Sequence, residues 1–444
     1  MKFVITFFFV SVALIATLTK REKLAAGLIV FLIPIGASPF WHPYNITVAL
    51  SAFLVWAAWI GMRMQNRDGD ALIHWSEISK WLVLLYGFLV FGIALAALNT
   101  NYSVLDLHGY TPFESIFNFS LYLVALICFI KLFVNFRDDI QFQKTLNYIF
   151  IATVFIQLGS TILLQFGFDQ YVPSFLVTTV DETSGFARSG GLLGDYELVV
   201  DYAMVTCALS VIELMTGGKK TIPLFALFAA VLLALISGTR SFLVTGFIFV
   251  FSLLLLNLTF KRMAVTLGIG TIIVAFSDNL VDFISKYLPI DVTFDRLAMA
   301  YYYLQMGDYQ KAVNRSILES IPGVISTAGI LGNGSLTIFK IKDDEMVYHS
   351  LYLAVYATFG VIGLAVLFFL LYKLVTISFR ICRHAENVIL RKEASVFFSL
   401  VMALIVNQTK ISALRYASSI LIYAFVAMNV YYMYYRYSKE AKAR

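Results

Sequence analysis

The sequence predicts an all-α fold, a polytopic membrane helix bundle of about 12–13 transmembrane helices with one large helical loop outside the membrane. Three observations predict it. Of the 444 residues, 60% are hydrophobic and only 14% are charged, and the mean hydropathy is +0.82. Apolar runs long enough to cross a bilayer recur along the chain, and basic residues gather in alternate loops between them. A soluble domain could not bury this much apolar surface.

The candidate spans follow one another along the whole chain, so residues 1–444 are interpreted as a single integral membrane domain. The first run is followed by the charged stretch Thr19–Lys23 and not by a small-residue cleavage site, which favours a span over a signal peptide. The thirteen predicted spans are 3–18, 24–39, 45–62, 81–98, 116–134, 146–166, 197–215, 222–237, 242–258, 263–277, 350–372, 394–407 and 416–434.

The distribution of charge predicts the topology. One set of alternate loops, together with the C-terminus, carries 22 of the 33 basic residues, which makes this set cytoplasmic by the positive-inside rule. The C-terminus is then inside and the N-terminus outside. Four segments are predicted on the outer face: 99–115, the periplasmic loop 167–196, the tight turn at Arg240, and the large periplasmic loop 278–349.

The large loop 278–349 shows helical periodicity. Asp295 could cap a helix in which Leu297, Ala300, Tyr301 and Leu304 form an amphipathic stripe. A second helix is predicted to end before Pro322–Gly323. Amphipathic helices of this kind could lie along the bilayer surface, could roof a cavity, or could do both.

Several classes of function are not supported by the residues. The basic residues are spread over short loops, which does not indicate binding to nucleic acid. The three cysteines have no spacing typical of a metal or disulfide framework, and the acidic groups Asp68–Asp70 and Asp343–Glu345 are interpreted as solvated loops. No nucleotide- or dinucleotide-binding motif is present. We therefore expect no metal site and no cofactor.

Arginine occurs at three places on the predicted outer face. Arg188 precedes Gly190 and Gly191, Arg240 lies in the turn Ser237–Ser241, and Arg296 and Arg315 lie in the large loop. Glycine lets backbone amides approach an anion, and the guanidinium fork binds phosphate oxygens two at a time. The set indicates a site for a lipid-linked phosphate or pyrophosphate. The alternative is ordinary turn glycines with solvated arginines, or an Arg240 that snorkels and anchors a helix end.

Three further residues could carry proton transfer or orient a substrate. His349 stands at the mouth of a predicted span, where it could act as a general base or simply cap a helix end. Asp195 and Glu197 lie where the loop 167–196 enters the seventh span. Either carboxylate could orient a sugar hydroxyl, act as a base, or pair with Arg188.

Four pieces of the chain resemble a known family. They are Arg188 followed by Gly190–Glu197, Ser237–Ser241 between two spans, a large outer loop that begins near Asp295 and contains Leu331–Gly334, and His349–Leu353 leading to Gly360–Gly363. In this order, and on one predicted face, they resemble the O-antigen polymerase and O-antigen ligase superfamily of bacterial envelope enzymes.

The resemblance implies a membrane glycosyltransferase of the inner (cytoplasmic) membrane that acts at its periplasmic face without nucleotide or metal. Its donor would be a glycan on undecaprenyl pyrophosphate. Arg188 and Arg240 would hold the pyrophosphate, assisted by Arg296 or Arg315, and His349 would activate the acceptor hydroxyl or organise the site, with Glu197 as second candidate for the base. A chain-length regulator and a flippase are the protein partners that such an enzyme could have.

Two alternatives stay open. A polymerase extends a lipid-linked glycan, whereas a ligase transfers it to lipid A core; the run Asp195–Glu197, where ligases more often show Asn or Pro, favours a Wzy-type polymerase. Arg296 followed eleven residues later by Gly307 also resembles a polymerase loop pattern. The other alternative is a transporter of polysaccharide or lipid-linked glycan, which charges inside spans would support. Asp201 lies one turn into the seventh predicted span and Glu213 near its cytoplasmic end.

Overall fold

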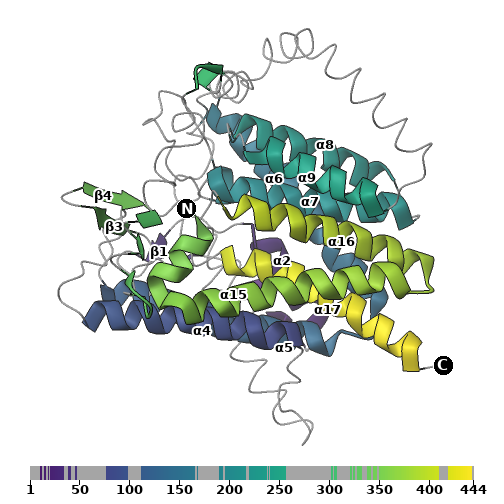
Figure 1. Ribbon diagram of the computed structural model, residues 1–444. Coiled ribbons are helices and arrows are strands. Elements are labelled where there is room, and N and C mark those ends of the chain that lie inside the picture. The colour runs from purple at the N-terminus through teal and green to yellow at the C-terminus, as the bar shows by residue number, and fades with distance from the viewer. Residues whose placement is uncertain are drawn as a thin grey trace, which may run out of the picture.

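The computed structural model shows a bundle of long α-helices (Figure 1). Over the described residues there are ten such helices, and three are long and apolar enough to cross a membrane: Ile140–Leu164, Leu198–Thr216 and Leu351–His384. The chain is a multi-pass membrane protein. The structure describes residues 11–12, 15–16, 19, 21–34, 39–41, 46–47, 77–98, 112–165, 168, 190–193, 196–216, 220–237, 239, 241–256, 302–303, 305–307, 321–322, 324–325, 328–332, 338–341, 344–347, 350–409 and 419–442.

Within these ranges the elements follow the predicted apolar runs closely. The helices are α2 (Glu22–Leu32), α4 (Glu77–Leu98), α5 (Pro112–Asn135), α6 (Ile140–Gln165), α7 (Tyr196–Thr216), α8 (Thr221–Ile236), α9 (Ser241–Leu256), α15 (Leu351–His384), α16 (Val388–Asn407) and α17 (Ile420–Lys442), with a 3₁₀ turn η2 (Gly191–Leu193). The strands are β1 (Pro39–Trp41), β2 (Ile46–Thr47), β3 (Ile338–Ile341) and β4 (Asp344–Val347).

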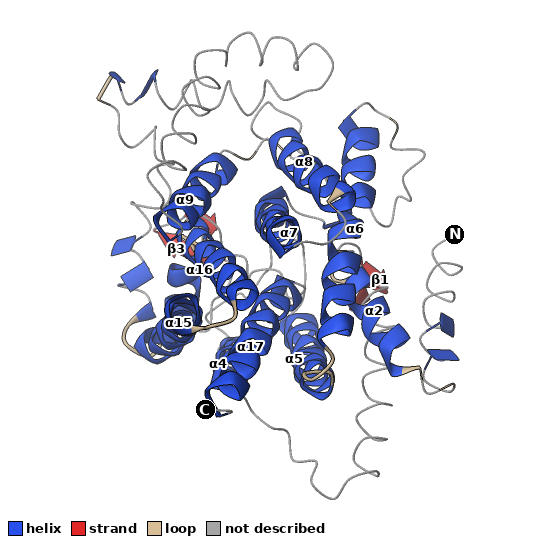
Figure 2. Cartoon of the chain, turned by 90° about the vertical axis from the view of Figure 1, so that its right-hand side faces the viewer, coloured by secondary structure: helices blue, strands red, loops and turns tan. Residues whose placement is uncertain are grey.

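Helix α7 is the centre of the bundle. Figure 2 shows it surrounded by α6, α8, α9, α16 and α17. A helix that is enclosed on all sides must be apolar or small-sided around its whole circumference. In α7 the side chains from Leu198 to Ser210, including Tyr202 and Ala203, are buried. A polar side chain in this helix therefore meets another helix and not solvent.

Helix α15 is long and broken. Its 34 residues would extend about 51 Å at 1.5 Å per residue, more than the roughly 30 Å of a hydrocarbon core. The backbone leaves helical geometry at Phe359 and Gly360, where Gly360 has φ of 62°. Helix α4 packs antiparallel against both halves of α15, with Phe88 stacked on Phe359 at 4.6 Å and Trp81 at 4.5 Å from Phe369 between ring centroids.

The basic loops meet at one end of the bundle. Lys23, at the start of α2, forms an ion pair with Asp139 in the α5–α6 turn at 2.5 Å. Asp138, the residue before Asp139, forms an ion pair with Lys439 in the last turn of α17. Lys392 in the first turns of α16 donates to the carbonyl oxygen of Met215 near the end of α7, at 3.3 Å. These contacts define the basic end. The loops that the charge pattern groups together thus lie together in space.

Two parts of the prediction are wrong in the N-terminal region. The predicted span 24–39 is too long because α2 ends at Leu32, and the predicted span 45–62 is wrong at its start, where Ile46–Thr47 forms a strand. The rest of that span lies outside the described residues. The strands β1 and β2 pair antiparallel. Pro34, Pro39 and Pro43 explain the difference, since proline lacks the N–H that a helix interior needs.

The large loop is not wholly helical as predicted. Strands β3 and β4 form an antiparallel hairpin in which Lys340 stands opposite Glu345 and Ile338 opposite Val347. The predicted span 263–277 and the predicted amphipathic helix that follows Asp295 lie largely outside the described residues.

Helix ends extend past several predicted spans. Helix α16 begins at Val388 and not at 394, because the side chain of Asn387 accepts hydrogen bonds from the N–H groups of Ile389 and Leu390 at 2.9 and 3.2 Å. This is an N-cap, which satisfies backbone donors that the helix cannot. Helices α15 and α17 likewise continue beyond the apolar runs into their basic last turns, which end at His384 and Lys442.

Candidate functional site

A buried polar cluster lies at the end of the bundle opposite the basic end. There α7, α15 and α17 begin and α16 ends. Asp201, in the second turn of α7, is fully buried, and each carboxylate oxygen accepts a hydrogen bond. The donors are Asn407 Nδ2 to Oδ1 at 2.7 Å, Gln408 Nε2 to Oδ2 at 3.0 Å, and the Tyr423 hydroxyl to Oδ2. One carboxylate thus holds three helices together.

The same cluster is bonded to the first turn of α15. The carbonyl oxygen of Gln408 accepts a hydrogen bond from the backbone N–H of Leu351 at 3.0 Å, and the Ser350 hydroxyl lies 3.5 Å from that oxygen. One turn earlier in α16, the carbonyl oxygen of Ile405 accepts from the Tyr352 hydroxyl at 2.8 Å. The N–H groups of a helix's first turn have no partner within the helix. Here the end of α16 supplies one.

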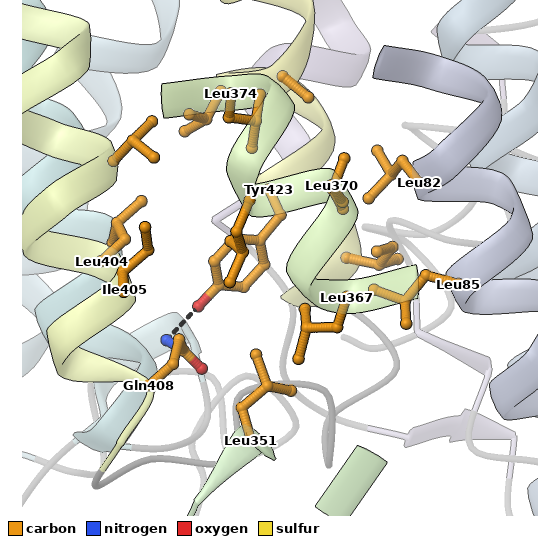
Figure 3. A pocket seen from close by; sticks show the side chains of 15 residues that line it. Leu82, Leu85, Leu351, Leu367, Leu370, Leu374, Leu404, Ile405, Gln408 and Tyr423 are labelled. Atoms are coloured by element: carbon orange, nitrogen blue, oxygen red, sulfur yellow. Dashed lines mark hydrogen bonds between the residues drawn. The ribbon is translucent and has the colours of Figure 1, made fainter. Parts of the chain in front are cut away.

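Beside this cluster lies a small apolar cavity between α4, α15, α16 and α17 (Figure 3). Its volume is about 60 Å³, and its walls are mostly leucines, among them Leu82, Leu367 and Leu404. Gln408 and Tyr423 stand at its margin, joined by a 2.5 Å hydrogen bond. Apart from these two residues the walls are apolar, so the cavity offers a sugar or phosphate almost no hydrogen-bond partners. Among the described residues, the cluster acts as a joint between helices.

The glycines predicted to bind substrate form a buried turn. Gly190 is buried, and Gly191 begins η2 with φ of 54°. An ideal Cβ on Gly191 would lie 2.7 Å from Thr161 Oγ1 and 2.9 Å from Gln157 Oε1, both on α6. Gln157 Oε1 also accepts from the N–H of Leu192 at 3.0 Å. Close packing on α6 is one reason for glycine at position 191, and the substrate-binding role of the two glycines stays a prediction.

The turn between α8 and α9 is held by its own hydroxyl groups. Ser237 Oγ donates to the carbonyl oxygen of Ala234 at 2.7 Å and lies 3.1 Å from Thr239 Oγ1. The side chains of Ser237, Thr239 and Ser241 are all buried. The backbone on both sides of Arg240 is thus fixed within the bundle at the end opposite the basic loops.

Two of the segments that carry the family resemblance, one in the large loop at Leu331–Gly334 and one in α15 at Gly360–Gly363, lie close together in the structure. The carbonyl oxygen of Ile330 accepts from the N–H of Val361 at 3.0 Å, immediately after the break in α15, and the carbonyl oxygen of Gly329 accepts from the Tyr356 hydroxyl at 2.7 Å. The part of the large loop around Leu331–Gly332 is therefore docked on α15 at Phe359–Gly360.

The structure describes only some of the predicted site residues. Gly190 and Gly191 are described, and Glu197 lies in the first turn of α7 although its side chain is outside the description. The remaining predicted residues lie outside the described ranges: Arg188, Asp195, Arg240, Arg296, Arg315 and His349. Gly190, Thr239 and Ser350, which lie within two residues of Arg188, Arg240 and His349 in the sequence, are at the end that carries the Asp201 cluster. The roles of all six residues stay predictions.

The sequence marks Asp201 only as a charge inside a predicted span and does not predict its partners. The signal was present, since a carboxylate in an apolar run is costly unless it is bonded. Asn407 and Gln408 form a second polar pair at the end of an apolar run. In the described part of the chain no three His, Cys, Asp or Glu side chains gather as a metal site would require.

No protein-family model matches the chain, and no curated protein matches its sequence. The family resemblance therefore rests on the residues themselves.

Proposed function

We propose that the protein is a Wzy-type polysaccharide polymerase. It would transfer a glycan from undecaprenyl pyrophosphate to the sugar hydroxyl of a second lipid-linked repeat unit, at the periplasmic face of the bacterial inner membrane. Metal and nucleotide take no part in this reaction. The basic end, held by contacts such as Lys23 to Asp139, is the cytoplasmic end under this proposal, and the opposite end carries the reaction.

One observation supports the proposal most. The Asp201 cluster joins the starts of α7, α15 and α17 to the end of α16, at the end opposite the basic loops. Glu197 lies one turn before Asp201, and His349 directly precedes Ser350. In the sequence, two candidate bases that are far from each other thus lie within four residues of members of this cluster. Such support is needed for groups that must be held in a reactive geometry.

The chemistry follows from the charges that change. As the glycosidic bond to the donor breaks, negative charge grows on the leaving pyrophosphate. Arg188 and Arg240, assisted by Arg296 or Arg315, would stabilise that charge most strongly in the transition state. The acceptor hydroxyl must lose its proton as it attacks, and neutral His349 or ionised Glu197 would take it.

A second candidate is favoured by two specific observations. Asp201 is a carboxylate buried inside a predicted span, and α15 is broken at Phe359–Gly360. Buried charges and discontinuous helices are features of transporters as well. Transport of a lipid-linked glycan is therefore the alternative from another class. The ligase alternative differs from the polymerase only in its acceptor, lipid A core.

The arginine assignment is tested with variants at the two ends of the bundle. Arg188→Ala and Arg240→Ala should each lower product formation at least ~100-fold, as loss of a donor to a developing charge does, while insertion into the membrane is unchanged. Arg383→Ala is the matched control, because Arg383 is exposed in the last turn of α15 at the basic end. Normal product from both outer-face variants would remove the pyrophosphate assignment.

A further inference from the structure

The cluster around Asp201 has one property that substrate binding does not explain. Asp201 is fully buried, all three of its described donors come from α16 or α17, and the cavity beside it is lined almost wholly by apolar side chains. Among the described residues, its carboxylate bonds only to other helices of the protein. A role for Asp201 must therefore act through the residues that it holds.

Those residues lead to the first turn of α15 by a short path. The side chain of Gln408 is fixed by Asp201 and by the Tyr423 hydroxyl, and the backbone carbonyl of the same residue bonds to the N–H of Leu351. Gln408 is also the C-cap of α16, with its own N–H bonded to the carbonyl oxygen of Leu404 at 3.0 Å. Its backbone and its side chain are thus both held.

We infer that Asp201 is a positioning residue: through Gln408 it fixes the start of α15, which in the sequence directly follows the predicted base His349. Consecutive Cα atoms are about 3.8 Å apart, so a shift of Ser350 or Leu351 moves the backbone of the preceding residue with it. Only the expected effect on kcat rests on the proposed function. The hydrogen-bonded link from Asp201 through Gln408 to Leu351 does not depend on it.

Tyr202 offers a matched control. It follows Asp201 in α7, is equally buried, and its hydroxyl lies 2.6 Å from Thr153 Oγ1 on α6. Tyr202→Phe removes a buried tyrosine hydroxyl without touching α15, α16 or α17, whereas Tyr423→Phe removes one that bonds to Asp201 and Gln408. Both changes should lower the unfolding temperature by a similar amount. The two variants should differ in hydrogen exchange at the start of α15 and in kcat.

The experiment compares wild type, Asp201→Asn, Tyr423→Phe and Tyr202→Phe in the same lipid or detergent. Hydrogen exchange of the segment 350–355 is measured, and kcat and KM are measured with an undecaprenyl-pyrophosphate-linked repeat unit. We expect Asp201→Asn to speed exchange at least ~10-fold and to lower kcat ~100-fold, the cost of misplacing a catalytic group by about 1 Å. The KM of Asp201→Asn should stay within ~3-fold of the wild-type value. Tyr423→Phe should show the same pattern more weakly, and Tyr202→Phe should leave both exchange and kcat at wild-type values.

Two results would overturn the inference: unchanged exchange at 350–355 in Asp201→Asn, or a kcat that falls equally in Tyr202→Phe and Tyr423→Phe, which would mean a general loss of stability. If wild type forms no product from the lipid-linked glycan, the proposed function fails, and the exchange measurement alone then decides whether Asp201 fixes the start of α15.

Discussion

An ideal Cβ atom on Gly360 would lie 1.9 Å from the carbonyl oxygen of Ile330. The same oxygen accepts the hydrogen bond from Val361, so the loop segment cannot withdraw without losing it. With φ of 62°, Gly360 is also in a backbone conformation that side chains oppose. The break in α15 and the docking of the large loop therefore depend on one residue without a side chain.

Gly360→Ala should strongly destabilise the protein. The φ value alone costs an alanine ~1–3 kcal/mol, and the contact with Ile330 adds to it because a backbone atom cannot turn aside. Thermal unfolding in detergent measures the loss. Gly246→Ala in α9 is the control, since its Cβ would have no neighbour within 4 Å, and the change should be neutral or stabilise by up to ~1 kcal/mol. Equal stability of the two variants would contradict the docking.

Gly191→Ala separates packing from substrate binding. Because a Cβ would press on Thr161 Oγ1, we expect a lower unfolding temperature together with reduced product. If Gly191 served only to let backbone amides approach a phosphate, the variant would unfold at the wild-type temperature and show a raised KM. The two measurements on one variant therefore decide between these roles.

Arg436→Ala should be far more damaging than its position near the C-terminus suggests. The Arg436 guanidinium donates to Glu393, which is only 6% exposed. Removal of one partner of a buried ion pair leaves an uncompensated charge and costs ~3–5 kcal/mol. Lys439→Ala removes a pair of which both members are more than half exposed, and should change the unfolding temperature little. Similar unfolding temperatures for the two variants would show that Glu393 is not buried as described.

The basic end should loosen in acid. The Lys439 ammonium lowers the pKa of Asp138 below its usual 3.8, and Lys23 together with the N–H of Phe142 does the same for the pKa of Asp139. A lowered carboxyl pKa adds stability above the unfolded value, near pH 4, which is lost as the pH falls through the folded value. The unfolding temperature of wild type should therefore exceed that of Asp138→Asn/Asp139→Asn by a constant amount from pH 7 to about 4. Below that the difference should shrink, and a difference that survives to pH 2 would contradict these shifts.

The sequence predicted the helices best where polar residues end apolar runs sharply. Helices α8 and α9 match the predicted spans within two residues at each end, because Lys219–Lys220 and Ser237–Ser241 bound them. The helix prediction fails where proline or strand pairing, and not apolar periodicity, determines the local structure. Prolines end α2 early, and β3 pairs with β4 in a part of the large loop where the sequence predicted only a solvated loop at Asp343–Glu345.

The polar cluster could not be predicted because its members are remote along the chain. Asn407, Gln408 and Tyr423 lie 206, 207 and 222 residues after Asp201. Helical periodicity shows which face of a helix is apolar but not which helix packs against it. A carboxylate inside a span indicates that a partner exists, and only the packing of α7 against α16 and α17 identifies it.

The measurement that tests the central claim most directly uses purified protein in lipid vesicles with an undecaprenyl-pyrophosphate repeat unit, with and without lipid A core. Products are separated by gel and mass spectrometry. The account predicts a ladder of lengthening glycans from the repeat unit alone, lost in Arg240→Ala. Product only in the presence of lipid A core would make the protein a ligase. No new glycan, combined with movement of the repeat unit across the vesicle membrane, would contradict the account and establish the transporter alternative.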